Sequence, residues 1–139
     1  MKDELVSFKV SKLAKEKGFN EETYAFYDST NTLINPLAAH KESNWTRHII
    51  LNKYNDGFVY NSTTGNKVNN YAAPTQSLLQ KWLREKHNIH IHLEYIGEGS
   101  YYIEATNFDS EVNIFMDNLY GTYEDILNII LEISIETIN

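Results

Sequence analysis

Two histidines and two glutamates have a spacing that would allow them to bind a metal ion. His90 and His92 are two residues apart, and side chains at that spacing share one face of a β-strand. Glu94 on the same strand, or Glu104 on the next, would be a third ligand for a transition metal. A metal held there would activate water, so one candidate function is a metal-dependent hydrolase.

The same pattern also has a simpler explanation. An alternating strand must place polar residues on its solvent face, and nothing else in the chain completes a known ligand spacing. His40, His48 and His87 belong to no recognisable acid–base pair, no serine or threonine stands in a nucleophile elbow, and the chain has no phosphate-cradling glycine loop or dinucleotide fingerprint. The sequence therefore predicts no metal, no cofactor and no catalytic residue, and it favours binding over catalysis.

Tyrosine offers another kind of chemistry, since the chain has 10 of them. Several fall on predicted strands: Tyr24, Tyr27, Tyr95, Tyr101 and Tyr102. On the open face of a sheet, a tyrosine gives rigid amphipathic contact area and can stack on a base or ring. Ordinary strand packing explains the same residues, so both interpretations stay open.

The candidate binding residues are those that the predicted strands turn to solvent, together with one arginine: His90, His92, Tyr102, Glu104 and Arg84. A protein partner would use the strand residues as a contact surface. A nucleotide would need Arg84 and the lysines of the first helix to clamp its phosphate while a tyrosine stacks on its base. Those groups would have to converge across a subunit boundary.

The residues around this surface predict a helix followed by a strand. Pro74 and Thr75 are typical of a helix start, and Leu78, Leu79, Trp82 and Leu83 recur on one helical face. Asn88 is a reasonable left-handed stop. From residue 89 the apolar period changes from 3.6 to 2, which predicts a half-buried strand over residues 89–95.

A β-hairpin should follow that strand. Residues 97–100 supply turn chemistry, and the alternation resumes over residues 101–107. Because paired residues share a face, Leu93 should oppose Ile103 and His92 should oppose Glu104. This register suits a three-residue loop with Gly99 left-handed.

The other elements are predicted from the same signals. A first helix spans residues 6–19 with Ser7 as its cap, and its four lysines (Lys9, Lys12, Lys15 and Lys17) should form a solvated outer surface or, alternatively, an anion-binding strip. Weaker patterns predict strands at 23–27, 32–34, 48–51, 58–60 and 112–116, a turn at 55–57 and a loop at 63–70. Residues 37–70 as a whole are loop-rich and suit a variable recognition surface.

The last helix begins at Thr122 and is unusually apolar. Its acidic residues form one narrow stripe, and isoleucine and leucine occupy most of the remaining surface. Such a helix either crosses the middle of the core or forms an oligomer interface with its second face. We expect a homo-oligomer, with Ile129, Leu131 and Ile133 facing the partner subunit.

The length and composition of the chain exclude several classes of protein. A chain of 139 residues suits one domain, and its lack of cysteine excludes disulfides and thiolate chemistry. A net charge of −7 argues against nucleic acid as a partner. The sequence has no apolar signal core and no stretch approaching the ~20 apolar residues that cross a bilayer, so we expect a cytoplasmic protein that does not enter the membrane.

One segment resembles a known family. Residues 73–91, which begin APTQSLLQKWLRE, together with residues 8–19 and 123–125, are similar to a widespread family of small uncharacterised proteins encoded by bacteriophages, prophages and other mobile elements of gut bacteria. The resemblance covers about a third of the chain and is specific only over the APTQSLLQKWLRE segment. It implies a genomic context and no mechanism.

These observations favour one fold and one function over their alternatives. The expected fold is a single compact α+β domain over residues 1–139, with an antiparallel sheet that carries helices on one face. The expected function is that of a phage-type accessory protein, a homo-oligomer that binds a host or phage protein. The alternatives are an anti-defence protein that sequesters a small nucleotide signal, and the metal-dependent hydrolase.

Overall fold

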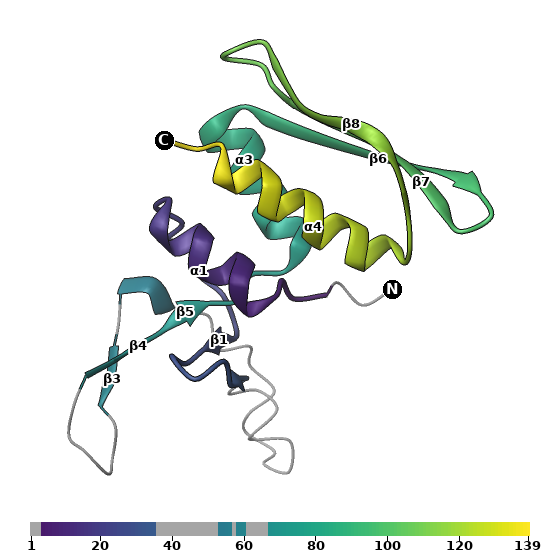
Figure 1. The fold of residues 1–139 in the computed structure, drawn as a ribbon. Coiled ribbons are helices and arrows are strands. Elements are labelled where there is room, and N and C mark those ends of the chain that lie inside the picture. The colour runs from purple at the N-terminus through teal and green to yellow at the C-terminus, as the bar shows by residue number, and fades with distance from the viewer. Residues whose placement is uncertain (1–3, 36–52, 57, 61–66) are drawn as a thin grey trace. The chain divides into compact units, whose positions relative to one another are not determined.

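The computed structural model describes residues 4–35, 53–56, 58–60 and 67–139, and it divides the chain into two compact units (Figure 1). The first unit comprises residues 1–6 and 75–139, and the second comprises residues 7–74. Each unit contains antiparallel strands and at least one helix, so the α+β fold class is confirmed. The expectation of a single domain stays a prediction, and the units are described separately below.

Helix α3, Gln76–His87, begins and ends as its sequence predicts. The Thr75 hydroxyl accepts from the Leu78 N–H at 3.2 Å, and Asn88 ends the helix in the left-handed conformation at φ 52°. Leu79, Trp82 and Leu83 are buried. The buried Gln76 side chain donates to the Glu124 carbonyl at 2.7 Å, which ties the start of α3 to the last helix of the same unit.

Three antiparallel strands follow α3 as a meander: β6 Ile89–Gly97, β7 Ser100–Asn107 and β8 Val112–Tyr120. The predicted register is confirmed, since Leu93 pairs with Ile103 and His92 pairs with Glu104. The loop is shorter than expected, because a bulge at Ile96 absorbs one residue and leaves Glu98 and Gly99 as a two-residue turn with φ of 53° and 72°. Strand β8 is four residues longer than the pattern at 112–116 predicted.

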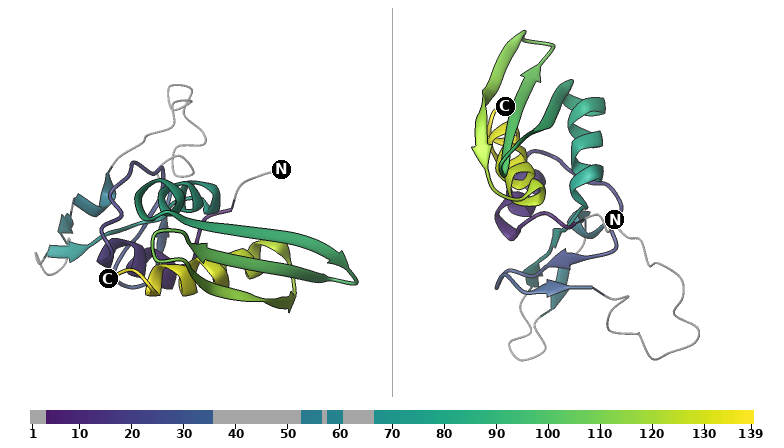
Figure 2. Two further views of the ribbon diagram at one scale, coloured as in Figure 1. Left: turned by 90° about the horizontal axis from the view of Figure 1, so that it is seen from above. Right: turned by 90° about the vertical axis from the view of Figure 1, so that its right-hand side faces the viewer.

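Helix α4, Tyr123–Glu136, starts at the Thr122 cap and packs on the same side of the sheet as α3 (Figure 2). Its Ile126 and Ile130 form the centre of the core with Ile103 and Ala105 of β7. The partly buried residues around them come from all three strands and from α4: Ile91, Leu93, Tyr101, Ile114, Phe115, Leu119 and Ile133. The apolar character of α4 is thus used mainly inside its own chain.

In the second unit, helix α1, Phe8–Glu16, has Ser7 as its N-cap, and Gly18 at φ 94° precedes the buried Phe19. Strand β1, Phe26–Tyr27, pairs on one side with β2, Leu33–Ile34, and on the other with β5, Tyr71–Ala72. The β1–β2 turn is held by the Asp28 carboxylate, which accepts from the Thr30 hydroxyl and from the N–H groups of Thr32 and Thr30. These bonds, the hydroxyl bond foremost, lower the pKa of Asp28.

A polar side chain, Asn55, connects distant parts of this unit. It lies in the 3-10 helix η1, Tyr54–Asp56, and donates to the Phe19 carbonyl at 2.7 Å while accepting from the Ala72 N–H at 2.7 Å. Both bonds join segments far apart in sequence. Asn55 therefore holds distant segments of the second unit together, although sequence patterns predicted only a turn at this position.

The prediction for the middle of the chain was partly wrong. Strand β3, Phe58–Tyr60, is where it was predicted, but it pairs with β4, Lys67–Asn69, inside the segment predicted as a loop. The pattern at 63–70 was misleading because the strand has only three residues, and asparagine, which is depleted in strands, is one of them and also flanks it on both sides. The predicted strand at 48–51 lies outside the described residues.

The core position of α4 can be tested with neighbouring isoleucines. Ile130 is fully buried, whereas Ile129 is 45% exposed. We expect Ile130→Ala to lower the free energy of unfolding by about 3 kcal/mol, because it leaves a cavity between α4 and β7. The matched variant Ile129→Ala should cost less than about 1 kcal/mol in the same urea titration. Equal costs would contradict this packing.

Candidate functional site

The sheet of the first unit has one side that no described element of the same unit covers. Both helices pack on the opposite side (Figure 2). The residues that the strand register assigns to this uncovered side, hereafter the open face, include His90, His92, Glu94, Tyr102, Glu104, Thr106, Asn113, Met116, Asn118 and Tyr120. It contains four of the five residues proposed from sequence for binding.

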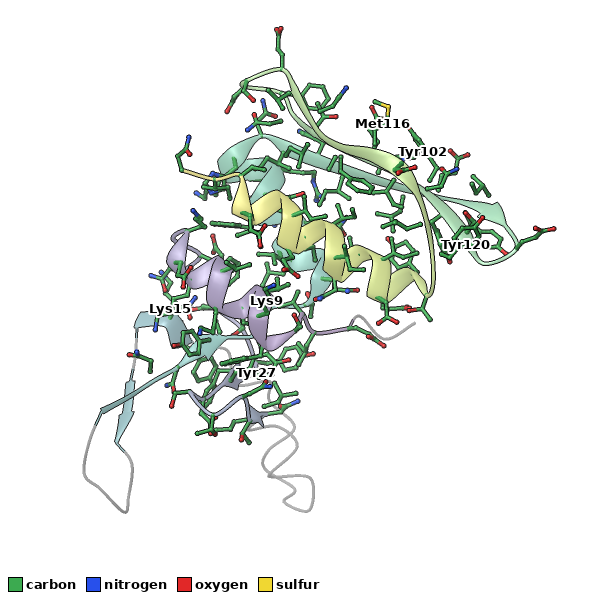
Figure 3. The ribbon with its side chains drawn as sticks, in the orientation of Figure 1. Lys9, Lys15, Tyr27, Tyr102, Met116 and Tyr120 are labelled. Carbon is green, nitrogen blue, oxygen red and sulfur yellow. The ribbon has the colours of Figure 1, made fainter. Side chains whose placement is uncertain are left out.

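The register arranges these side chains in cross-strand rows. His92, Glu104 and Met116 form one row, and Glu94, Tyr102 and Asn118 form the next. Met116 is 51% exposed and Tyr120, opposite Ser100, is 79% exposed. Tyr102, Met116 and Tyr120 extend from β7 and β8 (Figure 3). The open face therefore combines carboxylates with large apolar and aromatic contact area.

The two histidines have separate partners. His90 Nε2 lies 3.0 Å from Asn88 Oδ1, and its ring packs edge-on against Phe108 at 5.0 Å between ring centroids. His92 Nε2 lies 3.7 Å from Glu94 Oε2. Across the described part of the chain, no group of three His, Asp or Glu side chains is placed to hold a metal ion. The hydrolase hypothesis therefore gains no geometric support.

Arg84 does not lie on the open face. It is exposed in the last turn of α3, and α3 lies on the side of the sheet opposite the open face. The structure thus brings His92, Tyr102 and Glu104 together but does not add Arg84 to them. A phosphate clamp that combines Arg84 with Tyr102 does not form within this unit.

The three expected interface residues of α4 have different environments. Leu131 has no exposed surface and Ile133 packs against the core of the first unit. Ile129 is 45% exposed. Of the three, only Ile129 offers substantial surface to a partner subunit, because the core takes up most of the apolar surface of α4. Homo-oligomerisation itself stays a prediction.

The second unit contains a lysine–aromatic cluster that sequence analysis did not identify, formed by Phe8, Lys12, Lys15, Tyr27 and Tyr71. The Phe8 ring lies 5.6 Å from each tyrosine ring. Lys12 Nζ is 5.6 Å from the Phe8 centroid, and Lys15 Nζ is 5.1 Å from the Tyr71 centroid and donates to the Asn70 carbonyl at 2.7 Å. Burial lowers the pKa of Lys15 and raises that of Tyr27.

This cluster corrects the prediction made for the lysines of α1. Lys9 is exposed, but Lys12 and Lys15 are half-buried over aromatic rings (Figure 3 shows Lys9, Lys15 and Tyr27). Their charges already interact with the protein itself. The cluster is thus better explained as part of the packing of α1 on β5 than as an anion-binding strip.

Sequence analysis missed Asn118 and Tyr120 because it ended the last strand at residue 116, and it did not single out Met116 within that strand. The alternation of β8 is broken by a bulge at Ile114, where the register shifts between Ala105 and Thr106. Beyond the bulge, β8 pairs with β7 so that Met116 lies opposite Glu104, and no register was predicted for this pair of strands.

Comparison with known proteins identifies no relative: no family model matches the chain, and neither a curated protein nor a solved structure matches it. The resemblance to bacteriophage proteins therefore stays a prediction. In the described part of the chain, none of the helices has both the length and the apolar character needed to span a membrane.

The structural role of the lysine–aromatic cluster can be measured. Lys15→Met keeps the aliphatic stem but removes the cation over Tyr71 and the bond to Asn70, so we expect it to lower the free energy of unfolding by about 1–2 kcal/mol. Lys81→Met, at an exposed position of α3, is the control and should change it by less than about 0.5 kcal/mol. If Lys15→Met does not change the free energy of unfolding, the structural role is contradicted, and Lys15 would be available to bind a ligand.

Proposed function

We propose that this protein acts by binding another protein, and that its contact surface is the open face of the β6–β7–β8 sheet. The observation that carries the proposal is the combination of Met116 and Tyr120, both more than half exposed, with Tyr102 between them and carboxylates beside it. Aromatic residues and methionine are enriched in protein interfaces. A sheet face with these residues has the composition of a contact surface.

The rigidity of the sheet supports this proposal. Strand β7 is paired on both sides, and the core behind it is formed by Ile103, Ala105, Ile126 and Ile130. Side chains on such a scaffold lose little conformational freedom on binding, because the backbone beneath them is already ordered. The open face is thus preorganised for a partner.

Two alternatives find less support. A metal-dependent hydrolase would need a third ligand near His90 and His92, and the described residues provide no such group. A nucleotide-binding site would need free cations, whereas Lys12 and Lys15 interact with Phe8, Tyr71 and Asn70. The resemblance to phage proteins favours a role as an accessory protein in the cytoplasm of a bacterial host, and this role is part of the proposal.

Site-specific photocrosslinking in living bacteria tests the contact surface. The photoreactive residue p-benzoylphenylalanine replaces Tyr102 or Met116 in two variants of the full chain. Because both positions lie on the open face, we expect each variant to form the same covalent protein adduct on irradiation, visible as a band of higher mass.

The control places the same residue at Lys81, which is exposed on α3 and lies away from the open face. The adduct should be absent from this variant. Absence of adducts at both Tyr102 and Met116, or an identical set of adducts at all three positions, would contradict the proposal. An adduct of twice the protomer mass would identify a second copy of this chain as the partner and would thereby test homo-oligomerisation as well.

A further inference from the structure

Charge is divided very unevenly along this chain. All 12 lysines and arginines lie in residues 1–87, while residues 88–139 contain ten aspartates and glutamates and no lysine or arginine. The β6–β7–β8 sheet therefore has no permanent cation of its own. A surface built from this part of the chain is complementary to a positively charged partner and repels a nucleic acid.

The open face carries two of these ten acidic residues, Glu94 and Glu104. Glu94 lies directly opposite Tyr102, and Glu104 is two residues further along β7 on the same face. Glu94 and Glu104 are thus diagonal neighbours across the sheet, and the backbone positions of such neighbours lie roughly 7–8 Å apart, within reach of long side chains. Tyr102 shares the face with both carboxylates, directly across from one and two residues from the other.

Like charges on diagonal positions of a sheet repel each other, and the only cationic side-chain type beside them on the described strands is histidine, with His92 Nε2 at 3.7 Å from Glu94 Oε2. A cation from outside would relieve that repulsion. A guanidinium suits this place in particular, because it pairs with carboxylates through its planar set of donors and also stacks on an aromatic ring. An ammonium group would pair with one carboxylate but could not stack in the same way.

We infer that the open face binds an extended, arginine-bearing segment of a partner protein, with an arginine over Tyr102 between Glu94 and Glu104. The inference rests on the function proposed above and specifies the chemistry of the partner. Met116 and Tyr120 provide apolar contact for the neighbouring residues of that segment. An extended segment suits this surface because its alternate side chains match the spacing between rows of the sheet.

A synthetic peptide measures this directly. The probe is a fluorescein-labelled 12-residue peptide of alternating arginine and threonine, titrated with the full chain at about 50 mM salt, where electrostatic binding is strongest. We expect the double variant Glu94→Gln/Glu104→Gln to weaken binding by about tenfold and Tyr102→Ala by about fivefold. Fluorescence anisotropy gives the dissociation constants, and circular dichroism checks that each variant is folded.

The matched control removes the same number of charges elsewhere. Glu85→Gln/Glu136→Gln changes two exposed carboxylates on α3 and α4, and it should weaken binding by less than about twofold. Equal weakening by both double variants would mean that only net charge matters, and this would overturn the inference. So would a peptide with glutamine in place of arginine that binds as tightly, or a lysine peptide that binds equally well.

The crosslinking experiment separates failure of this inference from failure of the proposed function. Mass spectrometry of the Tyr102 adduct locates the crosslinked segment of the partner, and we expect an arginine within about three residues of the linkage, given the spacing of an extended chain. An adduct whose partner segment lacks arginine, or whose partner is a second copy of this chain, would overturn the inference but leave a protein-binding face. The absence of any adduct at Tyr102 and Met116 would overturn both.

Discussion

The packing of α4 against β7 is the interaction on which the open face depends. Ile126 and Ile130 meet Ile103 and Ala105 in the centre of the core. Because side chains alternate along a strand, burying Ile103 and Ala105 forces Tyr102 and Glu104 to the other side of the sheet. A slip of one residue would exchange the two sets. The hydrophobic contact on one face thus determines which chemistry the opposite face presents.

Local sequence signals were sufficient wherever a structural rule acts over a few residues. The caps at Ser7, Thr75 and Thr122 form the bonds that their residue types predict, and Asn88 ends α3 in the left-handed conformation. The register of β6 and β7 followed from alternation alone. For the same reason, the sequence alone pairs His92 with Glu104.

Contacts between residues far apart in the sequence could not be predicted from local patterns. Asn55 bonds to Phe19 and Ala72, and Gln76 bonds to Glu124, yet each looks like an ordinary polar residue in its local sequence. Lys15 lies over Tyr71, 56 positions later in the chain. Sequence patterns place a residue on a face of its own element, but they do not identify what that face contacts. The lysine–aromatic cluster was missed for this reason.

The segregation of charge gives a physical reason why the open face should be a site of binding. Glu94 and Glu104 share the open face without a lysine or arginine, and like charges on neighbouring strands repel each other. Stability alone would favour a lysine opposite Glu94 or Glu104, and the sequence has tyrosine and histidine at those positions. Tyr102 contributes an aromatic surface that remains half-exposed, and Met116 continues it. A cationic partner would offset the repulsion and bury this surface in a single step, so the features that are unfavourable in the free protein become favourable in the complex.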